Sequence, residues 1–252
     1  MRGTASSQPR ERGDVELRAA NRDFYDRLWS ASRLVEPDRF NTWPLVRPLS
    51  ADNLRRLEVA PGLRPRLPIE GTYFVDLSGP AMSALGARGA AVSVGLITAL
   101  PYRDGTFGLV CALDVVEHVD DDDRALAELA RVAAPGATLL LAAPLHPHLW
   151  TAFDDAVGHR RRYEPDRLLA LLASHGFSVV RSAVYGMQPK SSRLLDLGIW
   201  FLTHRRQRAM WWYNRVFMPL AVRWQKPLLL QDGMIATDAI DSVLLVCRKD
   251  MQ

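Results

Sequence analysis

The chain has 252 residues, with 32 Lys and Arg against 28 Asp and Glu, so its formal charge is +4 at pH 7. Its 48% hydrophobic and 24% charged residues are ordinary for a globular protein and exclude a disordered or collagen-like chain. No apolar run reaches the roughly 18 residues of a membrane span, and the first residues lack the apolar core of a signal peptide. So mild a charge argues against a nucleic-acid partner. Cys111 and Cys247 lie in apolar runs, as expected of buried thiols in the cytoplasm.

The pattern of elements changes after the first fifty residues. Residues 1–14 are polar and predict a flexible tail, and apolar residues at helical spacing from Val15 to Trp29 predict that 15–50 is a helical segment. Short apolar runs then alternate with helical patterns, which is typical of a parallel sheet. Seven strands are predicted at 56–59, 73–77, 91–95, 107–113, 137–143, 178–185 and 242–248, and helices at 81–88, 122–132 and 165–174.

The first two strand ends indicate what this sheet binds. The first strand runs into a tight turn at Ala60, Pro61 and Gly62, and the second ends at Asp76. Such a turn lets backbone N–H groups approach a ligand, and an acid at the second strand end can accept hydrogen bonds from both ribose hydroxyls. The pair predicts an adenosine-containing cofactor. An ordinary turn followed by a solvated aspartate is the alternative at this point.

A longer run downstream is more specific. The sequence Leu-Pro-Tyr-Arg-Asp-Gly-Thr-Phe at 100–107, followed by Glu117, His118 and Val119, resembles class I S-adenosylmethionine-dependent methyltransferases, in particular the branch of ubiquinone and menaquinone biosynthesis. The resemblance covers about residues 56–187. Dehydrogenases that bind NAD share the strand, turn and acid but do not explain this downstream run.

The resemblance implies an α/β fold with a Rossmann-like seven-stranded sheet, mostly parallel, whose last strand is antiparallel. It further implies one domain over 15–252, with a cofactor-binding core at 51–187, a helical cap insertion at 188–240 and the final strand at 241–249. S-adenosylmethionine would be the cofactor. Its expected contacts are Glu58, Ala60, Gly62, Asp76, Leu77, Leu96, Ile97, Asp114 and His118.

Four positions depart from the family pattern. Ala60 and Arg64 flank Gly62 where the family has further glycines, Leu96 stands where an acid commonly binds adenine, and Gly108 replaces another acid. These departures keep open a second hypothesis, in which a methyltransferase fold has lost catalysis and acts as a binding or regulatory partner.

The substrate side is predicted in the segment 144–163, because a long loop in a compact domain is usually functional. His146 and His159 are candidate catalytic bases with Asp154 to orient an imidazole, and a structural role is the alternative for each histidine. No metal is predicted, since His146 and His148 are two residues apart and no thiolate lies nearby. Predicted substrate contacts are His148, Trp150, Arg160, Tyr163 and Trp200.

The insertion at 188–240 is rich in tryptophan and arginine. It predicts either a cap with an aromatic pocket and a cationic rim, a segment whose aromatics simply pack on the sheet, or an interfacial helix that makes peripheral membrane contact. We therefore expect methyl transfer to a small-molecule or lipid-like acceptor, and the cationic residues favour one bearing an acidic group.

Overall fold

The computed structural model describes residues 26, 29–30, 32–186, 200, 204–205, 208, 211–212, 215–216, 218–238 and 240–251. The predicted tail, most of the predicted helix from Val15 to Trp29 and much of the insertion lie outside the described residues. None of the helices in the described part of the chain combines the length and apolarity that a bilayer crossing needs.

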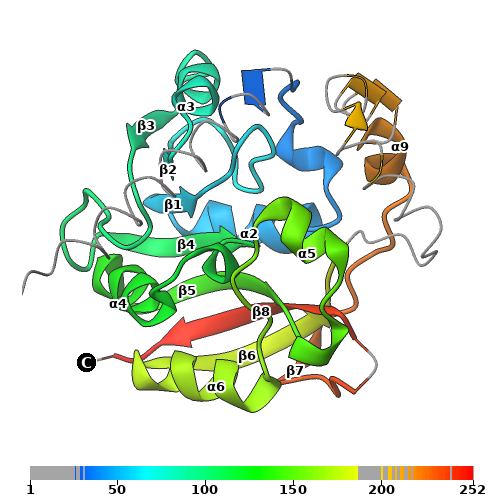
Figure 1. Ribbon diagram of the computed structural model, residues 1–252. Coiled ribbons are helices and arrows are strands. Elements are labelled where there is room, and N and C mark those ends of the chain that lie inside the picture. The colour runs from blue at the N-terminus through cyan, green and yellow to red at the C-terminus, as the bar shows by residue number, and fades with distance from the viewer. Residues whose placement is uncertain are drawn as a thin grey trace, which may run out of the picture.

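The core is one eight-stranded sheet with the order β3-β2-β1-β4-β5-β8-β6-β7 (Figure 1). β1 to β5 run parallel, β8 lies antiparallel between β5 and β6 as expected, and β7 is antiparallel to β6. All seven predicted strands are present. The strands are β1 (Arg56–Val59), β2 (Thr72–Asp76), β3 (Ala91–Val94), β4 (Phe107–Leu113), β5 (Ala133–Pro144), β6 (Phe177–Val184), β7 (Gln231–Asp232) and β8 (Ser242–Lys249).

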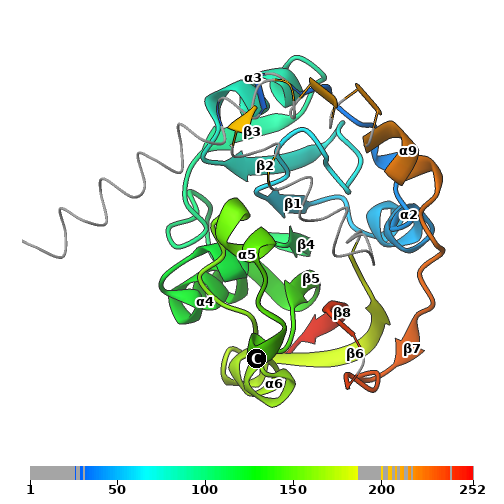
Figure 2. The same cartoon turned by 45° about the vertical axis from the view of Figure 1, so that its right-hand side comes forward.

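Helices cover both faces of the sheet (Figure 2). On one face, α4 and α6 bury Leu126, Leu129 and Leu168 against alternate strand residues. On the other face, α2 buries Leu45 and Val46. The helical elements are η1 (Pro37–Arg39), α2 (Trp43–Asp52), α3 (Gly79–Gly86), η2 (Val116–His118), α4 (Asp122–Val132), η3 (Pro147–Leu149), α5 (Ala152–Val157), α6 (Pro165–Ser174) and α9 (Met218–Arg223).

Several predicted boundaries are corrected. Helix α3 begins at Gly79 rather than 81 because the Ser78 hydroxyl accepts a hydrogen bond from Ala81 N and so caps the helix. Strand β5 begins at Ala133 because α4 runs into it without an intervening loop. The predicted loop at 144–163 contains η3 and α5, and β7 is an eighth strand in place of the seven expected.

The fold gives a direct test of the helix α4 interface. Leu126→Ala removes a fully buried side chain and leaves a cavity, so we expect the free energy of unfolding to fall by about 2 to 5 kcal/mol. Leu54→Ala, at a leucine that is 85% exposed, is the control and should change stability by less than about 0.5 kcal/mol. Urea unfolding followed by circular dichroism measures both, and equal losses would contradict the packing described here.

Candidate functional site

Three strained backbone positions mark one edge of the sheet. Ala60 follows β1 with φ 54°, Asp114 follows β4 with φ 54°, and His146 lies just beyond β5 with φ 59°. They are the non-glycine residues with positive φ in the described part of the chain. Left-handed backbone is costly for such residues and gathers at functional sites, and ligands of α/β sheets bind at the carboxyl ends of parallel strands. We therefore place the candidate site at this edge.

Asp76, at the end of β2, holds the turn that follows β1. Its carboxylate accepts hydrogen bonds from Gly62 N at 2.9 Å and Ser78 N at 2.8 Å. Burial raises the pKa of Asp76, and these backbone donors oppose the shift. Gly62 has φ +54°, and a side chain there would collide with the Trp29 indole. Glycine is thus required both by the backbone conformation and by the close approach of Trp29.

Glu58 organises the rest of the crossover from β1 to β2. Both of its carboxylate oxygens accept hydrogen bonds from Arg66 N, and one also accepts from Leu67 N at 2.8 Å. Residues 60–71 contain no helix, so these bonds hold a crossover that most parallel strands build with a helix. Burial raises the pKa of Glu58 to about 7 against the opposing backbone donors and Arg66.

A buried cation that sequence reasoning missed lies beside Glu58. The Arg66 guanidinium lies 3.6 Å from the Phe40 ring centroid and donates to the Tyr185 hydroxyl at 3.4 Å. Burial raises the pKa of Asp114 to about 6, and the charge of Arg66 opposes that rise. Arg66 and Tyr185 are 119 residues apart, so no local pattern could have paired them.

The predicted cofactor residues Leu77, Leu96 and Ile97, and Arg64 in the turn after β1, have the following surroundings. Ile97 is buried in the main core cluster, and Leu96 forms an isolated bridge with Ala99. Leu77 is half-buried. Arg64 lies over the Trp29 ring, 5.3 Å from its centroid. The cofactor roles of these residues stay predictions.

Beyond β5, a buried ion pair orients a histidine. Arg162 Nε and Nη2 donate to the two Asp154 oxygens at 2.9 and 3.0 Å. Asp154 Oδ1 in turn lies 2.7 Å from His159 Nδ1. Burial would raise the pKa of Asp154, but its bonds with Arg162, Thr151 and His159 hold it below its usual value. Asp154 is therefore an anion that fixes the His159 ring.

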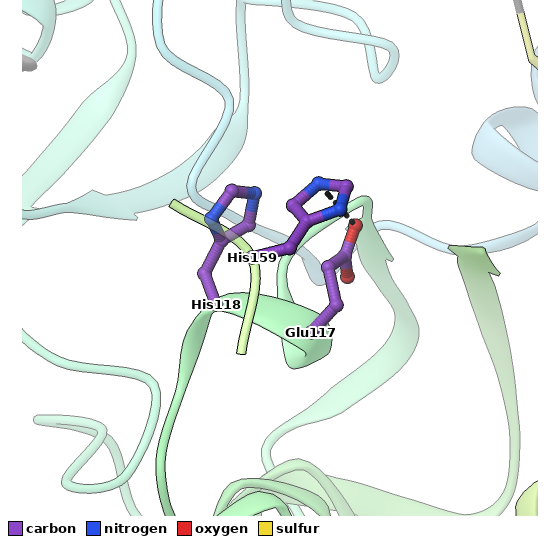
Figure 3. A group of neighbouring side chains, drawn as sticks. All are labelled: Glu117, His118 and His159. Atoms are coloured by element: carbon purple, nitrogen blue, oxygen red, sulfur yellow. Dashed lines mark ion pairs between the residues drawn. The ribbon is translucent and has the colours of Figure 1, made fainter. Parts of the chain in front are cut away.

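His159 faces two further side chains, shown in Figure 3. Its Nε2 is 3.8 Å from Glu117 Oε1, and its ring centroid is 4.7 Å from that of His118. Burial lowers the pKa of His118 to about 3, and burial also lowers that of His159. Glu117 is fully buried, its pKa is raised well above the usual value by burial, and neither carboxylate oxygen has a hydrogen-bond partner among the described residues. Both imidazoles are therefore neutral at pH 7.

The other predicted residues of 144–163 have structural partners. His146 Nε2 lies 2.8 Å from the Thr237 carbonyl, and the buried Tyr163 hydroxyl donates to Val116 O at 3.3 Å. The Trp150 indole donates to Asp155 at 3.1 Å. Arg160 is exposed beside Asp120, and the ring of His148 is 5.3 Å from that of His146.

Trp200, predicted as a substrate contact in the insertion, is half-exposed and stacks on His204 with the ring centroids 4.9 Å apart. His159 and Asp154 are thus the predicted catalytic residues that the fold brings together, whereas His146 bonds elsewhere. Glu117 stood in the quoted motif but not among the predicted site residues, because its burial cannot be read from sequence.

A separate groove of about 640 Å³ lies between η1 and α2 on one side and residues 222–230 on the other. Asn41 closes it by hydrogen bonds to Gln225 and Lys226. Its lining includes none of Glu58, Asp76 or His159. The strand edge, which gathers the strained backbone and the buried acids, therefore remains the candidate site.

Comparisons with known proteins fit this geometry. Residues 62–141 match the family model of a methyltransferase domain. Over 50 residues the chain is 46% identical to norajmaline N-methyltransferase of Rauvolfia serpentina, a match that covers 20% of this chain and 17% of that protein's length. The match is therefore local in both proteins.

Solved structures are similar over more of the chain. A SAM-dependent methyltransferase of Thermotoga maritima, described as a possible histamine N-methyltransferase, has a TM-score of 0.56 at 16% identity over 90% of this chain and 96% of that one. Phosphoethanolamine N-methyltransferase 2 of Haemonchus contortus, in complex with phosphomonomethylethanolamine and S-adenosylhomocysteine, has a TM-score of 0.55 at 16% identity over 92% and 61%. The expected α/β methyltransferase fold is confirmed, and the narrower resemblance to the ubiquinone and menaquinone branch stays a prediction.

The buried carboxyl of Glu58 predicts a pH dependence of stability. Its folded pKa of about 7 lies above the ordinary 4.5, so the folded state binds this proton more tightly. The stabilisation is complete below about pH 4.5 and is lost as the pH rises through 7. We expect the free energy of unfolding to fall by about 2 to 3 kcal/mol between pH 5 and pH 8 from this group. Glu58→Gln should abolish that component.

Urea unfolding at pH 5 and pH 8 measures the difference. Glu70→Gln, at an exposed glutamate close by in the chain, is the control and should keep the wild-type slope. A Glu58→Gln protein with an unchanged slope would contradict the assignment.

Proposed function

We propose that this protein is an S-adenosylmethionine-dependent methyltransferase acting on a small or lipid-like acceptor. The observation that carries the proposal is the hydrogen bond from Gly62 N to Asp76 at an edge where the strands β1, β4 and β5 all end in left-handed backbone. The methyltransferase domain match over residues 62–141 supports it.

The residues present fit the cofactor. Asp76 uses part of the capacity of its carboxylate on Gly62 and Ser78, and a carboxylate has about four acceptor positions, so ribose hydroxyls can be bound as well. The turn at Ala60–Gly62 carries no bulky side chain, and Ile97 offers an apolar contact. When bound, S-adenosylmethionine supplies a methyl group on a sulfonium that is transferred in line to a nucleophile.

His159 is assigned to the acceptor side of the edge. Asp154 receives the proton of Nδ1, so the lone pair of the neutral ring is on Nε2, directed toward Glu117. An acceptor hydroxyl or ammonium group must lose a proton to become a good nucleophile, and His159 is the group that we assign to promote this loss. Asp154, through the Arg162 pair, fixes the orientation of that group.

Exposed tryptophans in the insertion support a lipid-like acceptor. Trp211, Trp212 and Trp224 are 53%, 49% and 74% exposed, and Arg205 and Arg208 are exposed in the same segment. Tryptophan and arginine together are typical of surfaces that rest on a membrane interface. A small polar acceptor would need no such surface.

The inactive-partner hypothesis is favoured by one specific observation. Trp29 lies against Gly62, so close that a side chain at this position would collide with its indole. In that case the turn would be closed by the protein's own side chains, and no cofactor would bind.

Calorimetric titration separates the two functions. We expect S-adenosylmethionine and S-adenosylhomocysteine to bind with micromolar dissociation constants and NADH not to bind. Absence of binding by the first two would reject the enzyme in favour of the inactive partner.

The Asp76 assignment predicts a selective loss of affinity. Asp76→Ala removes charge-assisted hydrogen bonds and should weaken S-adenosylhomocysteine binding by about tenfold or more. His159→Ala should leave it nearly unchanged. Asp76→Asn keeps the shape of the side chain and controls for a collapse of the turn at Gly62. Equal weakening at positions 76 and 159 would show that the two sides of the edge are misassigned.

A further inference from the structure

Glu117, His118 and His159 bring three potential ligand atoms, one carboxylate oxygen and two imidazole nitrogens, within 4.8 Å of one another (Figure 3). Glu117 and His118 belong to η2, whereas His159 follows α5. Two neutral imidazoles and one carboxylate form a ligand set that first-row divalent metals take in proteins. We infer that these three side chains form a binding site for one divalent transition-metal ion of the Zn²⁺, Co²⁺ or Fe²⁺ type.

The state of Glu117 is the first argument for an ion. Its side chain is fully buried, and within the part of the chain that the structure describes neither carboxylate oxygen has a hydrogen-bond partner. A buried polar group without a partner is costly, and native structures contain few such groups. His159 Nε2 is 3.8 Å away, which is too far for a hydrogen bond. A cation between the two atoms would satisfy both.

The orientation of His159 is the second argument. Asp154 lies 2.7 Å from Nδ1 and is itself bound by Arg162, so it can only accept the Nδ1 proton. The lone pair is consequently left on Nε2, on the side of Glu117. A carboxylate that binds the far nitrogen of a histidine in this way is the usual outer partner of a metal-ligating imidazole.

His118 is held in the same manner. Its ring bonds to the Gly158 carbonyl, and one of its ring nitrogens lies within 4.8 Å of the ligand atoms of Glu117 and His159. Two ligand atoms of a tetrahedral zinc stand about 3.3 to 3.5 Å apart, given metal–ligand bonds of about 2.0 to 2.2 Å. The separation of 3.8 Å between His159 Nε2 and Glu117 Oε1 is close to that value. Small side-chain adjustments therefore complete the site.

Nitrogen ligands select the kind of ion. Mg²⁺ and Ca²⁺ prefer oxygen ligands, whereas imidazole suits Zn²⁺, Fe²⁺ and Co²⁺. Three protein ligands leave an open coordination position, and a metal at such a position lowers the pKa of a bound hydroxyl. This role in the reaction rests on the proposed function, because the acceptor would occupy the open position. Binding of the ion itself does not rest on the proposed function.

The sequence-based prediction of no metal rested on the spacing of His146 and His148. Neither histidine belongs to the group of Glu117, His118 and His159. His159 was assigned a catalytic role and His118 a cofactor role by sequence, and only the fold brings the two rings together.

Metal titration of the whole chain tests the inference. Protein dialysed against EDTA is titrated with Co²⁺ and followed by visible absorption, and Zn²⁺ is then added to displace it. We expect one equivalent of Co²⁺ with a micromolar or lower dissociation constant, bleaching by Zn²⁺, and a melting temperature raised by the ion. Lack of a one-to-one complex would overturn the site.

Variants localise the ion. Glu117→Gln and His159→Asn should each weaken Co²⁺ binding at least tenfold, whereas His175→Asn should not, because that histidine pairs with Asp123 away from the group. Binding that neither ligand variant weakens would overturn the assignment. Thermal unfolding of the metal-free variants checks that they fold, and His118→Ala is a third ligand variant. Calorimetry of S-adenosylhomocysteine binding to the metal-free protein tests the proposed function separately. A failure of that function can therefore be distinguished from a failure of the metal site.

Discussion

The position of His159 in the candidate site depends on the ion pair between Arg162 and Asp154. Both side chains are completely buried, and Arg162 also donates to Leu145 O and to Asp241. The pair thus joins α5, the end of β5 and the start of β8. Removing one member would leave an unpaired charge in the interior, which is far costlier than the net worth of the intact pair. Because Asp154 also bonds to His159 Nδ1, this pair sets the orientation of the His159 ring.

Buried acids give the strand edge an unusual electrostatic character. Glu58, Asp114 and Glu117 lie at or just beyond the ends of β1 and β4. Glu58 and Glu117 are buried and Asp114 is exposed, and loss of solvation raises the pKa of each. Arg66 opposes the rise at Glu58 and Asp114. Since carboxyl groups in a poorly solvated region favour positive charge nearby, the edge is suited to a sulfonium and to a metal cation alike. The same principle thus applies both to the part of the edge that we propose for the cofactor and to the part that we propose for the acceptor.

The parts of the fold that could be predicted are those with long periodic patterns. Helices α4 and α6 occupy the predicted residues because their apolar positions repeat at helical spacing and Asp121 caps α4 through Arg124 N. The two-residue strand β7 has no period to detect. The short helix α5 escaped because its capping box at Thr151 lies within a stretch of mixed polar residues.

For the site too, contacts between residues close in sequence could be predicted and contacts between distant residues could not. An aspartate orienting a histidine could be foreseen because Asp154 and His159 are five residues apart, but Arg66 and Tyr185 meet only through the crossover of β1 and the end of β6. The importance of Glu117 could not be foreseen either, since it follows from its burial without a hydrogen-bond partner among the residues that the structure describes and not from its neighbours in sequence.

The two-residue strand β7 has a consequence for the molecule's surface. It pairs with Arg181 and Ser182 of β6, on a side of the sheet that would otherwise present unpaired backbone groups, and the opposite edge strand β3 has only four residues. Long, flat edges offer a template for strands of other molecules, whereas short ones do not. The insertion that supplies β7 therefore also makes edge-to-edge pairing of this sheet with other molecules less favourable.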